Sequence, residues 1–182
     1  MLSPDGKKLL LDIARSAIEN QLGGVRTKSV PPKNPSLLVE KGVFVTLTKE
    51  RTLRGCIGRI EPRGPLFQTV AEVAKAAAFQ DPRFSPITAS ELPDIAIEIS
   101  ILSSLTQLQE INALEVGRHG LLIRRGFASG LLLPQVASEN RWSKEEFVGQ
   151  VCLKAALPVD AWRETAAELF TFTAEVFSEE DV

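Results

Sequence analysis

The sequence predicts an α+β fold with a mostly antiparallel sheet, because strand-like segments follow one another in hairpin order and helix-like segments fall between them. Two pairs of these strands are separated only by short turns, and no regular strand–helix–strand repeat is present. Antiparallel neighbours can be joined by a short turn, whereas parallel neighbours need a long crossover connection. We therefore expect a mostly antiparallel sheet packed with helices.

Three segments have the apolar spacing of amphipathic helices. The first begins after Ser3, a typical cap residue, and ends at Gly23. The second runs from Pro65 to Phe79. The third follows Ser143, which has capping-box spacing with Glu146. Each of these helices should pack one apolar stripe against the core.

Strand signals are clearest where apolar residues alternate with polar ones. The alternating isoleucines from Ile95 to Ile101 predict a strand with one buried face, and a polar turn between two segments predicts a hairpin. The expected strands are Val43–Leu47, Thr52–Ile60, Ile95–Ile101, Leu121–Arg124, Gly130–Leu133 and a single final strand Leu169–Phe177.

Two further segments connect these elements. Residues 25–36 contain three prolines and are expected to form a loop. Thr88 and Glu91 have capping-box spacing, which predicts one short helical turn before the isoleucine-rich strand.

The bulk composition is that of an ordinary globular protein. Of 182 residues, 44% are hydrophobic and 24% are charged, with a net charge of −2. This balance argues against nucleic-acid binding by bulk charge. No signal peptide or membrane-spanning run is visible, so we expect a soluble, cytoplasmic protein in which Cys56 and Cys152 are free thiols. The sequence predicts no cofactor and no metal site.

The segment around Cys56 is unusual because two glycines, Gly55 and Gly58, interrupt a strand pattern. Glycines inside a strand indicate a bulge or a close approach by another backbone or a ligand. Alternation would place Arg54 and Cys56 on one face, with Arg59 on the other. A nearby cation lowers the pKa of a thiol, so Arg54 is the residue expected to activate Cys56. Cys56 is either a functional thiol or a small buried packing residue, and Arg54, Gly55 and Gly58 are candidate ligand-binding residues.

A proline-bounded loop follows the second predicted helix and contains Asp81 and Arg83. Functional residues often lie on loops that a scaffold holds rigid. Asp81 and Arg83 are therefore candidate ligand-binding residues. The alternative is a structural ion pair that closes the helix end.

The only histidine, His119, lies between glycines just before a predicted hairpin. It could serve as a general acid or base or as an anion ligand. The alternative is a turn histidine that is hydrogen-bonded to the backbone.

The segment after the second hairpin begins at Pro134 and is expected to be a short helix. Gln135 and Glu139 are four residues apart and would share one face of it, so both are candidate ligand-binding residues. Trp142 and Cys152 are expected to be core residues.

Taken together, these segments resemble the AMMECR domain family. The resemblance extends over nearly the whole chain, and its motifs occur in the family's order. They are LRGCIG at 53–58, FQDPRF at 79–84, VGRHGL at 116–121, LLPQVA at 132–137 with Trp142, and CLKAALP at 152–158 followed by DAW at 160–162. The family pattern usually has glycine where Ala156 stands here.

The resemblance implies a single AMMECR domain over residues 1–182. Its α+β fold would have a larger sheet-containing part, a smaller lobe and a cleft between them into which the motif residues converge. It implies no particular reaction. In prokaryotes such domains resemble one member of a trio with a Memo-type protein and a radical-SAM protein, which makes these two proteins expected partners.

Two functions are compatible with these residues. In the first, the protein is a binding or adaptor module whose cleft around Cys56 holds a small polar or anionic ligand. In the second, it is an enzyme that uses Cys56 as a thiolate nucleophile or redox thiol, with His119 as acid or base. The sequence favours the first slightly and leaves the second open.

Overall fold

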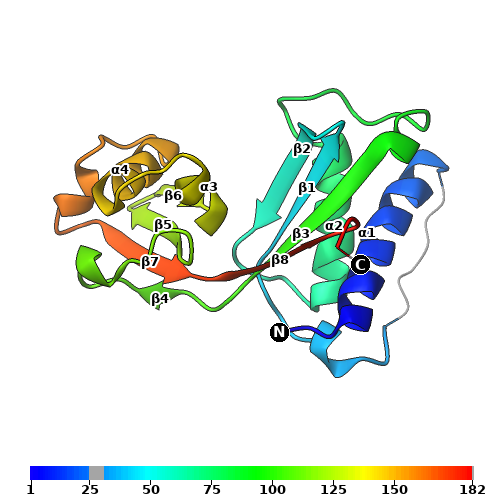
Figure 1. The fold of residues 1–182 in the computed structure, drawn as a ribbon, viewed down its shortest axis with the longest axis horizontal. Coiled ribbons are helices and arrows are strands. Elements are labelled where there is room, and N and C mark those ends of the chain that lie inside the picture. The colour runs from blue at the N-terminus through cyan, green and yellow to red at the C-terminus, as the bar shows by residue number, and fades with distance from the viewer. Residues whose placement is uncertain (25–30, 182) are drawn as a thin grey trace. The chain divides into compact units, whose positions relative to one another are not determined.

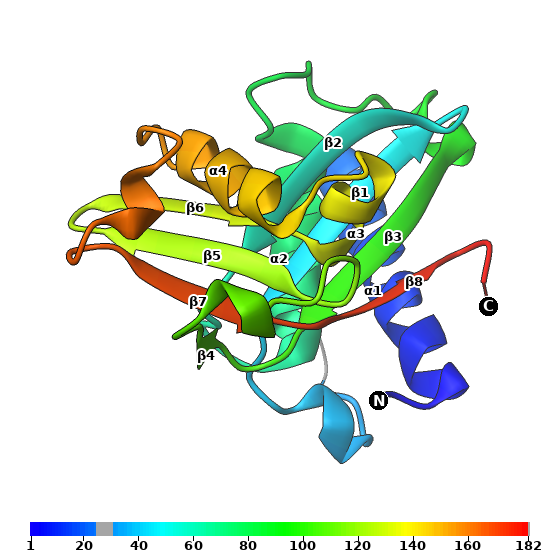
Figure 2. The ribbon, with the colours of Figure 1, turned by 60° about the vertical axis from the view of Figure 1, so that its left-hand side comes forward.

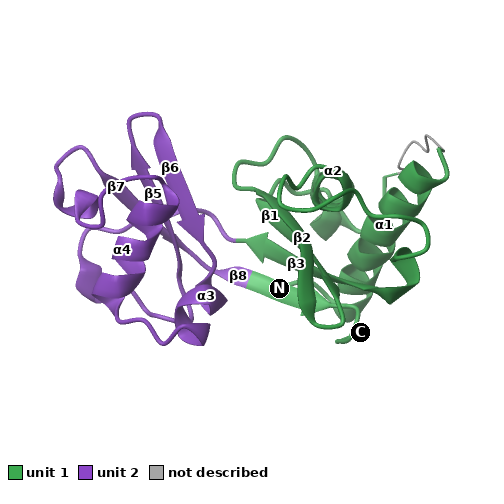
Figure 3. Ribbon diagram, turned by 90° about the horizontal axis from the view of Figure 1, so that it is seen from above, with its two compact units in different colours: residues 1–102, 175–182 green, residues 103–174 purple. Residues whose placement is uncertain are grey.

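The protein forms two compact units, shown in different colours in Figure 3. The computed structural model describes residues 1–24 and 31–181. The first unit comprises residues 1–102 and 175–182, and the second comprises residues 103–174. The predicted loop at 25–36 lies outside the described residues for positions 25–30. Each unit has its own hydrophobic core.

The first unit consists of a four-stranded sheet and two long helices, which lie on the same side of that sheet (Figure 1). The strand order is β2-β1-β3-β8. Its elements are α1 (Pro4–Leu22), a 3-10 helix (Pro35–Leu37), β1 (Val43–Lys49), β2 (Thr52–Arg59), α2 (Leu66–Phe79), a second 3-10 helix (Leu92–Asp94), β3 (Ile95–Leu102) and β8 (Ala174–Ser178).

The sequence patterns explain how this core forms. Ser3 caps α1 because its hydroxyl accepts a hydrogen bond from the Gly6 amide at 3.2 Å. The four alternating isoleucines of β3 are all buried, as predicted. They share a core with the buried residues of α1 and α2. One face of the sheet therefore carries both helices, and the intervening positions of β1 and β3 lie on the other face.

The predicted hairpin between β1 and β2 is confirmed, with one irregularity. The register shifts between Leu47 and Thr48, because Leu47 pairs with Gly55 and Thr48 pairs with Leu53. Arg54 is therefore the extra residue of a β-bulge. The predicted alternation of Arg54 and Cys56 on one face fails here, because a bulge interrupts the period of two.

The second unit contains a four-stranded sheet with the order β4-β7-β5-β6, and α4 lies over β5 and β6 (Figure 2). Its elements are β4 (Thr106–Gln107), a 3-10 helix (Ile111–Ala113), β5 (Gly120–Arg125), β6 (Ala128–Leu132), α3 (Pro134–Glu139), α4 (Lys144–Lys154), a 3-10 helix (Ala161–Arg163) and β7 (Glu168–Phe172). The α+β class is confirmed. The strand pairs with a described register are antiparallel, in two sheets.

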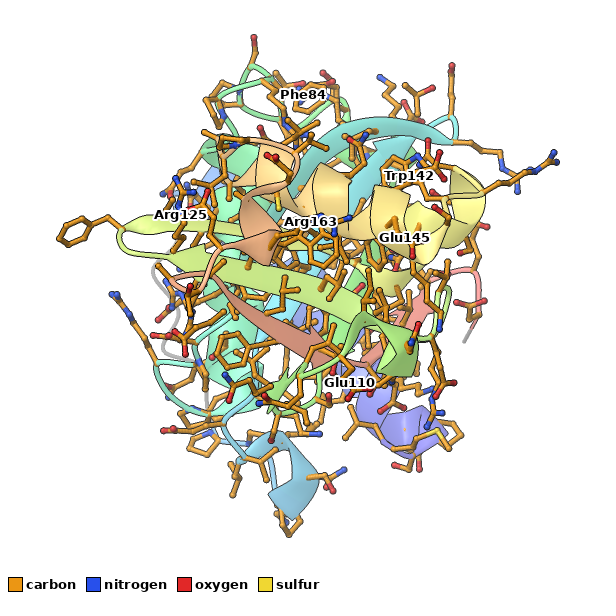
Figure 4. All side chains as sticks on the ribbon, turned by 90° about the vertical axis from the view of Figure 1, so that its left-hand side faces the viewer. Phe84, Glu110, Arg125, Trp142, Glu145 and Arg163 are labelled. Atoms are coloured by element: carbon orange, nitrogen blue, oxygen red, sulfur yellow. The ribbon has the colours of Figure 1, made fainter. Side chains whose placement is uncertain are left out.

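The start of α4 was predicted correctly from the local sequence. Ser143 and Glu146 form the predicted capping box at its start. Cys152 is fully buried in the core of this unit, as predicted, and burial raises the pKa of its thiol. Trp142 lies at the start of α4, with its ring 6.4 Å from that of Phe147 (Figure 4).

The predicted single final strand, Leu169–Phe177, is wrong. The chain forms two strands, β7 and β8, which belong to different sheets. The break falls at Thr173, whose carbonyl accepts a hydrogen bond from the Ser103 amide at 2.9 Å. Alternation continues through the break because both strands are extended, so the sequence pattern alone could not reveal the change of sheet.

Candidate functional site

Both glycines of the Cys56 segment meet close neighbours within the first unit. A Cβ atom at position 55 would collide with the backbone carbonyl of Ala77 in α2. A Cβ atom at position 58 would collide with the ring of Phe44 in β1. The predicted bulge and the predicted close approach of another backbone are both present. Gly55 and Gly58 thus have packing roles, and their part in ligand binding stays a prediction.

The Asp81–Arg83 loop is fastened to β2 through the backbone of Cys56. The Asp81 carboxylate accepts the Cys56 amide at 2.9 Å, and the Arg83 guanidinium donates to the Cys56 carbonyl at 3.3 Å. Since β2 is an edge strand, these two side chains satisfy backbone groups that would otherwise face solvent. The loop therefore acts as a partner for the edge strand at this one residue.

Asp81 is the buried centre of this arrangement. Its residue surface is only 4% exposed. Its carboxylate receives Arg83 Nη2 at 2.7 Å, Arg83 Nε at 3.0 Å and the Arg83 amide at 3.1 Å. The hydrogen bonds from the Arg83 side chain, together with those from the Cys56 and Arg83 amides, hold the pKa of Asp81 well below its usual range. Asp81 is therefore ionised at neutral pH, and its partner Arg83 is locked in one orientation.

Arg54 forms an ion pair with Glu91. Its Nε and Nη2 donate to the two carboxylate oxygens of Glu91 at 3.1 and 3.3 Å, and its Nη1 donates to the Ser85 carbonyl at 3.0 Å. Arg54 lowers the pKa of Glu91 to about 2, with further hydrogen bonds from Thr88. The predicted role of Arg54 as the cation that activates Cys56 is thus not supported by its contacts.

Phe84 connects the two arginines. The guanidinium carbons of Arg54 and Arg83 lie 5.9 and 5.5 Å from the centre of its ring. Contacts of this kind are attractive because the ring face is electron-rich. Phe84 and Glu91 were not singled out as site residues from the sequence. The capping-box spacing of Thr88 and Glu91 was the one available signal, and it indicated only a helical turn.

The Cys56 thiol is half-buried and belongs to neither hydrophobic core cluster. The Thr46 hydroxyl, on the neighbouring strand β1, lies 3.3 Å from Cys56 Sγ in hydrogen-bonding geometry. Thr46 and Cys56 are paired in the β1–β2 register. Sequence reasoning missed Thr46, because the register of the hairpin could not be derived once a bulge was present.

His119, in the second unit, closes a local turn. Its Nδ1 accepts the amide of Glu115 at 3.1 Å, and its own amide donates to the Glu115 carbonyl at 2.9 Å. A nitrogen that accepts a hydrogen bond carries no proton, so in the neutral imidazole the proton is on Nε2. The free edge of this histidine is therefore a donor. These contacts are those of the second alternative, a turn histidine that is hydrogen-bonded to the backbone, and a role as acid, base or anion ligand stays a prediction.

The predicted short helix of the second unit is α3, and it lies next to the histidine turn. A Cβ atom at Gly117 would lie 3.6 Å from the Ser138 side chain, which shows how closely the two segments pack. Gln135 is half-buried and Glu139 is exposed. They share α3 with the spacing expected of one face.

The structure thus assembles the predicted residues in two groups, each within one unit. Arg54, Gly55, Cys56, Gly58, Asp81 and Arg83 belong to the first unit, and His119, Gln135 and Glu139 belong to the second. The convergence of all nine in one cleft stays a prediction. In the described part of the chain, no three Cys, His, Asp or Glu side chains gather as a metal site would require. No helix there has the length and apolar character to cross a bilayer.

Fold and site together define a two-unit α+β protein in which a loop Asp–Arg pair is fastened to a thiol-bearing edge strand. The AMMECR1 family profile matches residues 11–177, and the chain therefore belongs to this family. A protein of Methanothermobacter thermautotrophicus is 42% identical, with 98% of this chain and 97% of that protein covered. A protein of Thermococcus onnurineus is 44% identical, with 95% and 90% covered.

A solved structure has the same fold. It is the crystal structure of an uncharacterised protein from Pyrococcus horikoshii, which is 39% identical and has a TM-score of 0.88. The match covers 95% of this chain and 91% of that one.

Proposed function

We propose that this protein is a binding or adaptor module that holds a small polar or anionic ligand at Arg83, beside Cys56. One observation carries the proposal. The Arg83 side chain is 53% exposed although two of its nitrogens are fixed by the buried Asp81. Its Nη1 has no hydrogen bond to any described residue. The two N–H donors of Nη1 therefore remain for a ligand, on a guanidinium that is held in one orientation.

Preorganisation is what makes this arginine suited to binding. A free arginine loses side-chain entropy when it captures a ligand, whereas Arg83 has already lost much of it to Asp81. Because Asp81 also neutralises its charge, selectivity would come from the geometry of the donors and not from net charge. A carboxylate or phosphate oxygen can accept a charge-assisted hydrogen bond from the N–H groups that remain on Nη1.

Inorganic phosphate is a suitable first probe. We expect phosphate titration to shift the backbone NMR signals of Cys56 and Arg83 in the wild-type protein. Arg83→Met should abolish these shifts, whereas Arg63→Met, which removes an exposed arginine of the same unit, should preserve them. Equal shifts in wild type and Arg83→Met would overturn the proposal.

We further propose that the adaptor role involves a Memo-type protein and a radical-SAM protein, the partners that the family resemblance suggests. Phe127 supports a docking function. It is fully exposed in the two-residue turn between β5 and β6. Only Gly126 in this turn has a positive φ, of 58°, so the backbone does not require an aromatic at position 127. An exposed aromatic of this kind is a typical interface anchor.

A binding measurement with a purified Memo-type protein tests this extension. Phe127→Ser should weaken binding about tenfold or more, because burying a phenylalanine contributes roughly 2–3 kcal/mol. Val176→Ser, at an exposed apolar residue of the first unit, serves as the matched control. Unchanged affinity in Phe127→Ser would show that Phe127 is not part of the interface.

The alternative function is an enzyme that uses Cys56 as a nucleophile or redox thiol. The observation in its favour is the Thr46 hydroxyl within hydrogen-bonding distance of Sγ, at a thiol that lies outside the core. His119 would act as an acid through Nε2. Once a substrate is known, full activity in Cys56→Ser would exclude this alternative.

A further inference from the structure

The sheet of the first unit has two edge strands, and they are protected differently. In the strand order β2-β1-β3-β8, the edges are β2 and β8. At β2, the Cys56 amide and carbonyl are bonded by Asp81 and Arg83, and a bulge interrupts the strand. An edge strand that lacks such protection can pair with another chain. The protection of β8 therefore depends on the partners of its outward backbone groups.

The hydrogen bonds at the end of β8 show which of its residues face outward. The Glu179 amide donates to the Ile97 carbonyl of β3 at 3.1 Å, so it points into the sheet. Backbone groups of successive strand residues point alternately to the two sides, so those of Ser178 and Val176 point away from β3. The Ser178 amide agrees with this direction, because it donates to Asp181 Oδ2 at 2.8 Å. Val176 therefore presents its N–H and C=O groups along the outer edge.

Val176 is the unprotected residue of this edge. It is 40% exposed, and among the described residues no side chain or loop bonds its backbone. Asp181 satisfies the Ser178 amide just as Asp81 satisfies the Cys56 amide on the other edge. Since no described side chain does the same for Val176, β8 keeps one open pair of backbone donor and acceptor.

A cavity of about 510 Å³ adjoins this open pair. It is lined by Pro4 and Lys7 of α1, by Val176 and Phe177 of β8, and by Asp181. The start of α1 thus forms one wall and the edge strand forms another. Extended peptides add to exposed sheet edges through backbone hydrogen bonds, and pockets beside the edge receive their side chains. The open pair and the cavity together provide both of these elements.

The charges that line the cavity favour a basic side chain. Lys7 is already paired with Glu175 at 3.2 Å, and its ammonium lies 5.5 Å from the centre of the Phe177 ring. Asp181 accepts both hydrogen bonds from Ser178 through Oδ2, and no described lysine or arginine forms an ion pair with it. The second oxygen, Asp181 Oδ1, is therefore available to a cation.

We propose that β8 accepts an extended, lysine-containing segment of a partner protein as a fifth strand of the sheet. The backbone of the segment bonds the N–H and C=O groups of Val176. A lysine side chain enters the cavity, where its stem packs against Pro4 and Phe177 and its ammonium binds Asp181. This inference concerns the edge opposite the one that Arg83 contacts, and it goes beyond the proposed function.

A partner protein fits this edge better than a second copy of the chain. A second copy would pair through its own β8, whose sequence is AEVFS. That strand contains no lysine or arginine, so Asp181 would gain no cation from it. The charge of the cavity therefore favours a basic segment from another protein.

A short peptide of alternating lysine and threonine, blocked at both ends, is the probe. Its binding to the full chain is read from the backbone NMR signals of Val176, Phe177 and Ser178. We expect these signals to shift with the lysine peptide and to stay unchanged with a glutamate–threonine peptide of the same length. A lysine peptide that is N-methylated at every amide keeps its charge but cannot donate backbone hydrogen bonds, so it should bind far more weakly. Equal shifts from the N-methylated peptide would overturn the inference.

The backbone contact is tested by a variant of the strand itself. Val176→Pro removes the outward N–H, a change that edge strands tolerate, and it should abolish the peptide-induced shifts at Ser178. Val176→Ser keeps this N–H and should still bind. Full binding in Val176→Pro overturns the inference, and the N-methylated peptide decides the same point if Val176→Pro does not fold.

The charge contact is tested by Asp181→Asn. This variant keeps an acceptor for Ser178, and it should raise the dissociation constant of the lysine peptide about two- to fivefold, as expected for an exposed ion pair. Asp12→Asn, which changes an exposed acid of α1, is the matched control. Equal affinity in Asp181→Asn and wild type overturns the inference.

The same spectra separate this inference from the proposed function. A lysine peptide that shifts Cys56 and Arg83 in place of Val176 binds at the other edge, and this result overturns the inference. Val176 signals that change with protein concentration alone show that a second copy occupies β8, which also overturns it. If no peptide shifts any signal, the inference fails, whereas the phosphate test of Arg83 keeps its own outcome.

Discussion

In the first unit, several hydrogen bonds around the Cys56 segment join residues far apart in the sequence, whereas those around His119 in the second unit span single turns. Asp81 and Cys56 are 25 residues apart, and Arg54 and Glu91 are 37 apart. In the second unit, Glu115 bonds His119 four residues on and Arg118 three residues on. The first group therefore requires the folded sheet and helix, while the second depends mainly on local turn geometry. Substitutions in the first group should affect the stability of the fold far more.

The sharpest contrast is between Gly55 and Gly117. Gly55→Ala should cost about 3 kcal/mol or more, because its Cβ would strike the Ala77 carbonyl inside a packed helix–sheet contact. Gly117→Ala should cost only about 1–2 kcal/mol, because its Cβ would meet Ser138 at an ordinary contact distance of 3.6 Å and only the positive φ of 85° is unfavourable. Chemical denaturation measures the free energy of unfolding of both variants. Equal losses of this free energy would show that Gly55 and Gly117 are equally constrained by their surroundings.

A second contrast uses one ion pair from each unit. Asp81→Asn should lower the free energy of unfolding by about 2–3 kcal/mol, because a buried acceptor of four hydrogen bonds loses its charge. Glu115→Gln should have no measurable effect, because Glu115 and Arg118 are both exposed. Denaturant titration at neutral pH compares them. A stable Asp81→Asn variant would mean that the loop is held by other contacts.

Acid should lower the stability of the first unit, because it protonates the carboxylates of Asp81 and Glu91. The folded-state pKa of Glu91 is lowered from 4.5 to about 2, and that of Asp81 is also lowered. The unfolded chain therefore binds more protons, and the stabilisation present above pH 4.5 is lost as the pH falls toward 2.

This loss of stability in acid is tested by measuring the thermal unfolding midpoint from pH 6 to pH 2. The midpoint should fall less steeply with decreasing pH in an Asp81→Asn/Glu91→Gln double variant than in wild type. Parallel curves would contradict the role of these two groups. Glu40→Gln, which removes an exposed acid of the same unit, is the control.

The smallest expected effect concerns the end of α4 in the second unit. The Leu157 amide bonds the Cys152 carbonyl and the Ala156 amide bonds the Leu153 carbonyl, which is a Schellman motif. Its left-handed residue is Ala156, with φ of 57°. Ala156→Gly should therefore stabilise the protein by about 1 kcal/mol. Ala155→Gly, at a residue with φ of −85°, should not. Loss of stability in Ala156→Gly would contradict the strain assignment.

The Ala156 case also shows how far sequence comparison reaches. The resemblance drawn from the motifs implies that glycine is usual at this position, and a positive φ is a physical reason for it. The presence of alanine in place of glycine could be noticed from the sequence, but its cost in stability could be assigned only once the φ angle of Ala156 was known.

Local physics determined much of the fold in advance. Ser3 and Ser143 set the starts of two helices through side-chain caps, and the isoleucines of β3 set one buried face by alternation. These signals depend on neighbours within a few residues, so a sequence contains them completely. The family assignment was likewise predicted from motifs and is confirmed by the profile match to residues 11–177.

Pairing between distant segments was decided only by the tertiary structure. The bulge at Arg54 interrupted the expected alternation, and the break at Thr173 assigned one alternating segment to two sheets. Neither leaves a mark on local periodicity, because an extended chain alternates whichever partner it has. The pairing of Thr46 with Cys56 became visible for the same reason, since register across strands depends on packing and not on any one strand's sequence.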